Sequence, residues 1–208
     1  MPINKLKKNK VSKNWIKKRK KDIFFNQSKA HGYRSRSAFK LIEMNEKFNF
    51  LKSNTHLVDL GSSPGGWCQV AAKKITKGKI LAVDIKNMEK QKNVDFIIGD
   101  MNNVEVQEKI INYFEKRIDV VVSDMAPNTS GNKNLDTYRT GELCLNAMNL
   151  AQKILIQKGV FVAKLFMGSI FKEIKKKAEK SFKNVIMYKP LSSKKESKEV
   201  YIYCKGIL

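Results

Sequence analysis

One segment near residue 60 constrains the fold more than any other, because a short apolar run ends there in a glycine-rich turn. The run Leu57–Leu60 is followed by Gly61 and then by the pair Gly65 and Gly66, after which a helical pattern begins. A buried strand that turns into a helix through glycines is how α/β proteins receive nucleotide-like cofactors. Glycines let the backbone approach a ligand closely and tolerate positive φ angles. We therefore predict an α/β domain with a cofactor site at this turn.

The spacing of these glycines distinguishes between cofactor classes. It is Gly-x-x-x-Gly-Gly over 61–66, whereas dinucleotide-binding proteins carry Gly-x-Gly-x-x-Gly. No Lys-Ser or Lys-Thr pair follows, which excludes a P-loop. S-adenosylmethionine is the cofactor that fits best, and an NAD-dependent oxidoreductase is disfavoured.

Beyond this turn the chain alternates between strand-like and helix-like segments. Strands are predicted at 56–60, 79–84, 94–98, 118–123 and 159–166, and helices at 35–50, 66–75, 104–116, 137–157 and 169–180. Strands separated by helices indicate a parallel sheet with helices on both faces. Two last strands, at 184–189 and 199–205, have no helix between them, which favours an antiparallel pair and hence a mixed sheet.

Positive charge is concentrated in two parts of the chain. The formal net charge is +23; residues 1–40 carry fourteen Lys or Arg against the single acid Asp22, and residues 171–198 carry ten Lys against three Glu. Clustered basic residues indicate contact with a polyanion, usually RNA or DNA. We predict that residues 1–28 form a basic, flexible arm that contacts RNA, followed by a single domain over 29–208.

Composition also excludes several classes of protein. Cys68, Cys144 and Cys204 are too scattered for a disulfide framework, and with two histidines they supply too few ligands for a zinc site. No uncharged apolar stretch approaches the roughly 18 residues that span a membrane. The first residues lack the apolar segment of a secretory signal, so we expect none. We expect a cytoplasmic protein that binds no metal and works as a monomer.

Three successive strands are each predicted to end in an aspartate. Asp84 follows Gly61 by 23 residues, the placement of an acid that accepts hydrogen bonds from both ribose hydroxyls of an adenosine. Asp100 follows the next strand, where it is placed to accept from an adenine amino group, and Asp124 follows the one after. Each of them alone also fits a turn or a helix N-cap. Because ligands bind beyond the carboxyl ends of parallel strands, three together favour one shared cofactor.

A lysine interrupts one of the most apolar strands. Lys164 lies within Gly-Val-Phe-Val-Ala-Lys-Leu-Phe, and lysine is rarely buried without a partner, although near a strand end its ammonium can reach water. A desolvated lysine beside another cation is a recognised general base. Lys40 is a candidate for that cation, and Glu199 for a carboxylate that orients one lysine. For Lys40 and Glu199 the residues alone favour a solvated helix face and a strand-edge charge.

Five motifs together resemble one family, the FtsJ/RrmJ ribosomal RNA 2′-O-methyltransferases. In chain order they are Arg34–Leu41, Val58–Trp67, Val121–Gly131, Phe161–Phe166 and Ser197–Tyr203. The resemblance implies a Rossmann-like, S-adenosylmethionine-dependent methyltransferase fold whose seven-stranded mixed sheet has its last strand inserted antiparallel. It implies catalytic residues at Lys40, Asp124, Lys164 and Glu199. It implies cofactor contacts at Gly65, Trp67, Asp84, Asp100 and Asp124.

The resemblance also implies a reaction, methyl transfer to the 2′-hydroxyl of a uridine in 23S rRNA of the large ribosomal subunit. Relatives act on tRNA or on mRNA caps, so another RNA remains an alternative substrate. A base N-methyltransferase would carry Asn/Asp-Pro-Pro-aromatic where this chain has Asp124–Asn128. A largely non-catalytic RNA-binding assembly factor is a further alternative, although it would be expected to lack one of the catalytic residues. Lys164 is expected to manage the proton, either as a base or by steering the lone pair of the hydroxyl.

Overall fold

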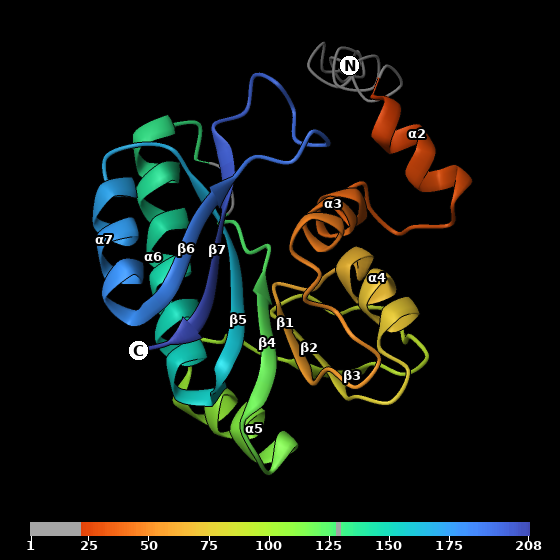
Figure 1. The fold of residues 1–208 in the computed structure, drawn as a ribbon. Helices are drawn as coiled ribbons and strands as arrows, with labels where there is room; N and C mark the ends of the chain where they lie inside the picture. Colours follow the sequence, from red (N-terminus) through yellow and green to blue (C-terminus); the bar gives the residue numbers. More distant parts are fainter. Residues whose placement is uncertain (1–21, 128–129) are drawn as a thin grey trace, which may run out of the picture.

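The structure, a computed structural model, describes residues 22–127 and 130–208, which form a mixed β-sheet with helices on both faces (Figure 1). The strands are β1 (Leu57–Leu60), β2 (Ile80–Asp84), β3 (Asp95–Ile98), β4 (Ile118–Ser123), β5 (Leu155–Phe166), β6 (Phe182–Tyr188) and β7 (Glu199–Ile207). Their order across the sheet is β3-β2-β1-β4-β5-β7-β6. Strands β1 to β5 are parallel, and β7 pairs antiparallel with β5 and β6. The predicted seven-stranded mixed sheet with one inserted reversed strand is confirmed.

Two apolar clusters join the helices to the sheet. The helices are α2 (Ile23–Ala30), α3 (Ala38–Phe48), α4 (Gly66–Lys74), α5 (Val104–Phe114), α6 (Lys133–Ile154) and α7 (Phe171–Ser181). One cluster packs α3 and α4 against one face of the sheet, and the other packs α5, α6 and α7 against the opposite face (Figure 1). Within the part of the chain that the structure describes, no helix is both long and apolar enough to cross a membrane.

The long helix α6 begins and ends for local reasons. At its start, the side-chain oxygen of Asn132 accepts the backbone N–H groups of Asn134 and Leu135 at 3.0 and 3.3 Å, as an N-cap does. At its end, Leu155 leaves the helix and pairs with Ile118 of β4. The helix predicted over 137–157 is therefore wrong at its last three residues, which are the first of β5. A short apolar run does not reveal by itself whether it is a helix or a strand.

The predicted arm over 1–28 is described only at its end. Residues 1–21 lie outside the described residues, so the flexible arm and the domain start at residue 29 stay predictions. The described end forms α2, where the Asp22 carboxylate caps the helix by accepting the N–H of Phe25 at 3.1 Å. Phe24 packs on Phe39 of α3, with ring centroids 5.6 Å apart, so α2 contacts the domain.

Strand β1 contains a buried carboxyl group, and this makes stability depend on pH. Asp59 is 1% exposed, and burial raises its pKa to about 7, although the Cys68 thiol donates a hydrogen bond to it at 3.0 Å. In the unfolded chain an aspartate titrates near about 3.9. Between those pH values only the folded protein binds the proton, so stability falls as pH rises from about 4 to about 7, and above that this group causes no further change with pH.

We expect Asp59→Asn to remove this dependence, because asparagine resembles the neutral acid and does not titrate. Urea unfolding of both proteins at pH 5, 6, 7 and 8 measures it. The unfolding free energy of wild type relative to the variant should fall by about 1.4 kcal/mol from pH 5 to 6, and by much less from pH 7 to 8. Parallel profiles over the whole range would contradict the assignment.

The topology also decides where a site can form. The carboxyl ends of the parallel strands β1, β2, β4 and β5 lie at one edge of the sheet, where open α/β sheets bind ligands. The reversed β7 begins at this same edge, because Glu199 pairs with Phe166, the last residue of β5. Residues from both ends of the chain can therefore meet there.

Candidate active site

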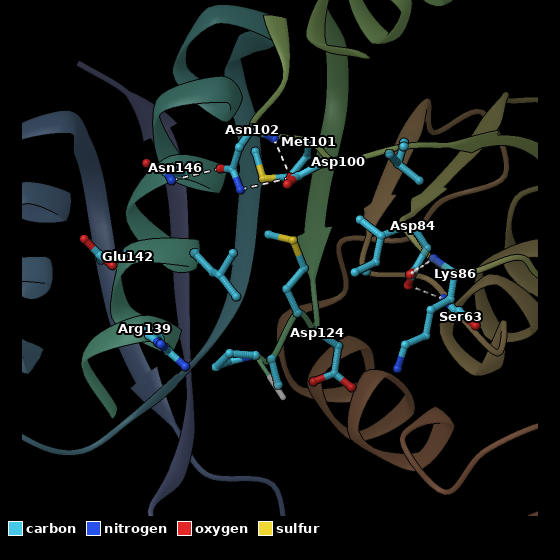
Figure 2. Close-up of a pocket in the computed structure, with 18 residues that line it drawn as sticks. Ser63, Asp84, Lys86, Asp100, Met101, Asn102, Asp124, Arg139, Glu142 and Asn146 are labelled. Carbon is cyan, nitrogen blue, oxygen red and sulfur yellow. Dashed lines mark hydrogen bonds between the residues drawn. The ribbon is translucent and has the colours of Figure 1, made fainter. Parts of the chain in front are cut away.

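A cavity of about 570 Å³ opens at the carboxyl ends of β1, β2 and β4 (Figure 2). That volume lies within the roughly 300–1,000 Å³ of small-molecule sites. Asp84, Asp100 and Asp124 all line it, each from the end of a different strand. The three acids predicted to share one ligand are thus brought together around one hollow.

The Asp84 carboxylate is held by the backbone of two loops. Its Oδ2 accepts the N–H of Ser63 at 2.9 Å, and its Oδ1 accepts the N–H of Lys86 at 2.8 Å. A carboxylate has further lone pairs, so both oxygens can still accept from a ligand. The sequence left open whether Asp84 is a turn residue or a cofactor ligand. In the structure Asp84 fits both roles, because its carboxylate orders two turns and also faces the cavity.

Asp100 is oriented by a short chain of amides that reaches α6. Its Oδ1 accepts both the backbone N–H and the side-chain amide of Asn102, at 2.9 and 3.0 Å, and Asn102 accepts from Asn146 at 2.9 Å. Asn146 lies with Arg139 and Glu142 on one face of α6, on the side of the cavity away from Asp84 (Figure 2). The sequence did not reveal this polar face of α6, because polar residues at the same spacing also occur on a helix face that is exposed to solvent.

Gly65 and Trp67 do not line the cavity. The Trp67 side chain is 3% exposed, its Nε1 donates to the carbonyl of Ser37 at 2.8 Å, and its ring lies 5.8 Å from that of Tyr201. Gly65 has φ +107°, and a Cβ there would lie 2.8 Å from the Arg34 guanidinium and 2.9 Å from the Met88 sulfur. Both residues support the loop and helix beside the cavity, and their direct contact with a cofactor stays a prediction.

Arg34 joins the two loops that hold Asp84. Its guanidinium donates to the carbonyls of Pro64 at 3.3 Å, Glu89 at 2.8 Å and Lys90 at 3.1 Å. Pro64 belongs to the loop after β1, and the other two to the loop after β2. A planar guanidinium can donate several bonds in a fixed geometry that lysine does not reproduce.

We therefore expect Arg34→Lys to weaken S-adenosylmethionine binding about tenfold, as losing one to two net hydrogen bonds would. Isothermal titration calorimetry with the methyl donor measures this. Arg117→Lys is the matched control, because Arg117 also donates to a carbonyl, that of Leu155 at 3.0 Å, but from the far edge of the sheet. Equal affinity of the Arg34 variant and wild type would show that the loops hold their positions without the guanidinium.

Beside the cavity, Lys164 is paired with Asp124. Its Nζ lies 3.0 Å from Asp124 Oδ1 and donates to the Asp124 carbonyl at 2.5 Å. The Lys164 side chain is only 8% exposed. The lysine that was expected to need a partner if buried therefore has one, and that partner lines the cavity.

A second pair and one tyrosine complete the cluster. Lys40 Nζ lies 2.6 Å from Glu199 Oε1. Tyr201 connects the two pairs, because its hydroxyl donates to Asp124 Oδ1 at 2.7 Å and its ring lies 5.6 Å from Lys40 Nζ. The structure thus gathers all four predicted catalytic residues. It adds Tyr201, which lies opposite Lys164 in the β5–β7 ladder.

The electrostatics of this cluster favour an ionised Asp124. Burial alone would raise the pKa of Asp124, but the charges of Lys164 and Lys40 and the hydrogen bond from Tyr201 hold it below its ordinary value. Burial and the charges of Asp124 and Glu199 raise the pKa of Tyr201 well above its ordinary value. At neutral pH Asp124 is therefore a carboxylate and Tyr201 a neutral donor.

These residues suit S-adenosylmethionine. The cavity is lined by four carboxylates, those of Asp84, Asp100, Asp124 and Glu142, against two cations, Lys86 and Arg139. This acidic balance favours a ligand with positive charge and donor hydroxyl or amino groups, which this cofactor carries on its sulfonium, amino acid and ribose. It disfavours the phosphates of a dinucleotide. Over residues 22–127 and 130–208, no group of three or more His, Cys, Asp or Glu side chains is placed to hold a metal ion.

Comparison with known proteins also identifies a methyltransferase. Residues 33–207 match the FtsJ-like methyltransferase family. The chain is 49% identical over 200 residues to "Ribosomal RNA large subunit methyltransferase E" of Pelagibacter ubique, covering 96% of this chain and 98% of that one. It is 41% identical to the protein of the same name from Acinetobacter baylyi, covering 98% and 95%. A solved structure described as a ribosomal RNA methyltransferase of Plasmodium falciparum superposes with TM-score 0.76 at 33% identity, covering 85% and 99%.

Proposed function

Because this chain belongs to the FtsJ-like methyltransferase family, we propose that it methylates the ribose 2′-hydroxyl of a uridine in 23S rRNA within the large ribosomal subunit. The chain is an S-adenosylmethionine-dependent methyltransferase. Its relatives from Pelagibacter ubique and Acinetobacter baylyi are named for the ribosomal RNA of that subunit. The observation that supports the 2′-hydroxyl as the methyl acceptor is the Lys164–Asp124 ion pair, in which a buried lysine lies beside the cofactor cavity and its partner Asp124 lines it.

A ribose hydroxyl is a weak nucleophile, so the protein has to align it and manage its proton. When bound, S-adenosylmethionine supplies an electrophilic methyl group. Lys164 Nζ is the group that either takes the proton, if it reacts as the neutral amine, or steers the lone pair of the hydroxyl toward the methyl carbon, if it stays an ammonium. Asp124 holds Nζ through its carboxylate and its carbonyl, and it would contact the amino acid end of the cofactor.

The second pair acts on the ribose. Lys40 orients the ribose from α3, and Glu199 balances its charge at 2.6 Å. Tyr201 fixes the Asp124 carboxylate. Asp84 and Asp100 would hold the ribose and the adenine of the cofactor, and the loop after β1, whose Gly61 and Ser63 line the cavity, would contact it.

The RNA backbone is held by lysines near this edge. The loop between β6 and β7 carries exposed lysines beside the catalytic cluster: Lys189, Lys194, Lys195 and Lys198. The lysines of α7, in contrast, lie on the face of the sheet opposite α3 (Figure 1). We therefore assign the first contact with the target nucleotide to the loop, and a longer-range contact to α7 and the basic arm.

Binding should weaken steeply with salt, because each neutralised phosphate releases counterions. About four phosphate contacts predict a roughly 100-fold loss of RNA affinity between about 50 and 200 mM salt. Fluorescence anisotropy with a labelled 23S rRNA fragment measures this. An RNA affinity that does not change with salt would show that the loop lysines do not bind the phosphate backbone.

The reaction itself is tested with tritiated S-adenosylmethionine and large subunits purified from cells that lack this modification, followed by nucleoside mapping. Label on the 2′-oxygen of a uridine is the expected result. Label on a base would indicate an N-methyltransferase, and label on tRNA alone another RNA substrate. No transfer to any RNA, with cofactor binding intact, would favour the assembly-factor reading.

We further propose that the enzyme acts as a monomer in the cytoplasm. Light scattering on the purified protein tests the first, with a mass of 23.9 kDa expected. Fluorescence microscopy of a tagged protein tests the second.

A further inference from the structure

One carboxylate near the site is not used by the chemistry above. Glu43 lies on α3, three residues after Lys40, and accepts two backbone hydrogen bonds from the β6–β7 loop. Its Oε2 accepts the N–H of Leu191 at 2.6 Å, and its Oε1 accepts the N–H of Ser192 at 2.9 Å. Charge-assisted, bidentate contacts of this kind are strong and geometrically specific.

The same stretch of loop is held from a second side. The guanidinium of Arg36 donates to the carbonyl of Ser192 and also pairs with Asp22, which caps α2. Both Arg36 and Glu43 come from the N-terminal part of the domain, whereas the loop lies about 150 residues later in the chain. Residues 191 and 192 are therefore fixed to the α3 region by their backbone.

The next residue of the loop reaches the catalytic cluster. Ser193 Oγ donates to Glu199 Oε1 at 2.8 Å, and this oxygen lies 2.6 Å from Lys40 Nζ. The contacts form a closed circuit from Glu43 through the loop, Ser193 and Glu199 to Lys40, one turn away on the same helix. Glu199 is thus held by a hydroxyl whose own position depends on the Glu43 contact.

We propose that Glu43 is a positioning residue for methyl transfer, which locks the β6–β7 loop so that Ser193 and Glu199 hold Lys40 toward the ribose. This rests on the proposed function of Lys40. The same lock fixes the lysine-rich loop next to the site, so that its charges and Lys40 are arranged together before RNA arrives. Such preorganisation of the groups around a reacting atom is where small displacements reduce catalysis most.

The first test is Glu43→Gln, since an amide can accept only one of the two N–H groups and presents its own N–H₂ to the other. We expect a roughly 10- to 100-fold lower kcat on large subunits, with the melting temperature and the Kd for S-adenosylmethionine near wild type. Glu46→Gln is the matched control, because Glu46 is an exposed acid on the same helix, and it should behave as wild type.

A double-mutant cycle separates positioning from general support of the fold. If Glu43 acts through Ser193, then Glu43→Gln should change kcat by no more than about twofold in a Ser193→Ala background, because interacting residues are not additive. Fully additive losses, or a fall in kcat that only follows a fall in melting temperature, would overturn the proposal.

Chemical labelling of Lys40 tests the role of Glu43 without measuring methyl transfer, so it applies even if the enzyme does not catalyse the proposed reaction. Amine-selective acetylation followed by mass spectrometry measures how accessible Lys40 is. Glu43→Gln and Ser193→Ala should each accelerate labelling of Lys40 several-fold, whereas Glu46→Gln should not. Unchanged Lys40 labelling in the Glu43 variant would overturn the circuit, whatever RNA the enzyme modifies. Faster labelling in an enzyme with no transferase activity would retain the circuit and reject only the proposed reaction.

Discussion

Lys164→Ala is expected to lower kcat for methyl transfer roughly 10²- to 10⁴-fold, the range that a positioned acid or base contributes. The reason is that the buried Nζ of Lys164 lies beside the cavity, held by Asp124 at 3.0 Å from its carboxylate and 2.5 Å from its carbonyl. Affinity for S-adenosylmethionine should stay within about threefold of wild type, since the acids proposed to hold its adenosine, Asp84 and Asp100, are untouched. Single-turnover transfer to large subunits measures the first quantity, and calorimetry the second.

Lys158→Ala is the matched control for this substitution. Lys158 lies on the same strand, β5, but is exposed and far from the cavity end. It should retain wild-type turnover. If Lys164→Ala also retained it, Lys164 would have no part in the reaction, and the buried pair would be structural.

Lys164→Arg distinguishes the two roles that the geometry allows. Arginine keeps the positive charge and the donors but does not deprotonate in proteins. A loss as large as that of alanine would indicate that Lys164 accepts the proton. Partial retention, with a flattened pH–rate profile, would indicate that its charge steers the hydroxyl.

Much of the fold was predictable because it follows from local patterns. The run Leu57–Leu60 with its glycine turn, and the absence of a helix between β6 and β7, both depend on residues close together in the chain. The boundary between α6 and β5 was predicted wrongly, because Leu155 is apolar on either assignment and is placed by its pairing with Ile118. Pairing across 37 residues is a tertiary effect that periodicity does not contain.

The candidate site divides in the same way. Acids at strand ends could be predicted, since all parallel strands end at one edge. Tyr201 was missed as a separate residue, although its spacing of two from Glu199 on a strand puts both side chains on one face. The contact of Glu43 with the loop at 191–192 had no sequence signal, because Leu191 and Ser192 donate through their backbone N–H groups and Glu43 has the pattern of an ordinary helix-surface acid. Long-range contacts to backbone atoms are not visible in side-chain patterns.

Asp124→Asn is expected to reduce both turnover and stability. The variant leaves Lys164 Nζ without its carboxylate, and removing one partner of a buried ion pair costs about 3–5 kcal/mol. The Asp124 carbonyl still accepts from Lys164, so we expect the lower end, about 3 kcal/mol of unfolding free energy. Turnover should fall at least roughly 100-fold, because Lys164 is no longer held. Urea unfolding and single-turnover transfer measure the two effects.

Asp95→Asn is the control for the loss of an aspartate bonded to a tyrosine. Asp95 accepts from the Tyr113 hydroxyl, as Asp124 accepts from Tyr201, but it is exposed at the start of β3. Its substitution should change unfolding free energy by no more than about 0.5 kcal/mol. A similar loss in both variants would mean that the tyrosine bond, and not the pairing with Lys164, stabilises the site.

The pH dependence of the Asp124→Asn effect identifies its cause. The folded pKa of Asp124 lies below its ordinary value, so its charge stabilises the protein above the unfolded pKa of about 3.9 and loses that contribution as pH falls through the folded pKa. The contribution of Asp124 itself to the difference in unfolding free energy between wild type and variant should therefore be constant from pH 5 to 8 and shrink only in acid. A difference that changes between pH 6 and 8 would instead belong to a group titrating there. In this part of the sheet that group is Asp59, whose pKa is raised to about 7 mainly by burial and in part by the charge of Asp124. Repeating the measurement in an Asp59→Asn background separates the two carboxylates, because any change that survives there cannot come from Asp59.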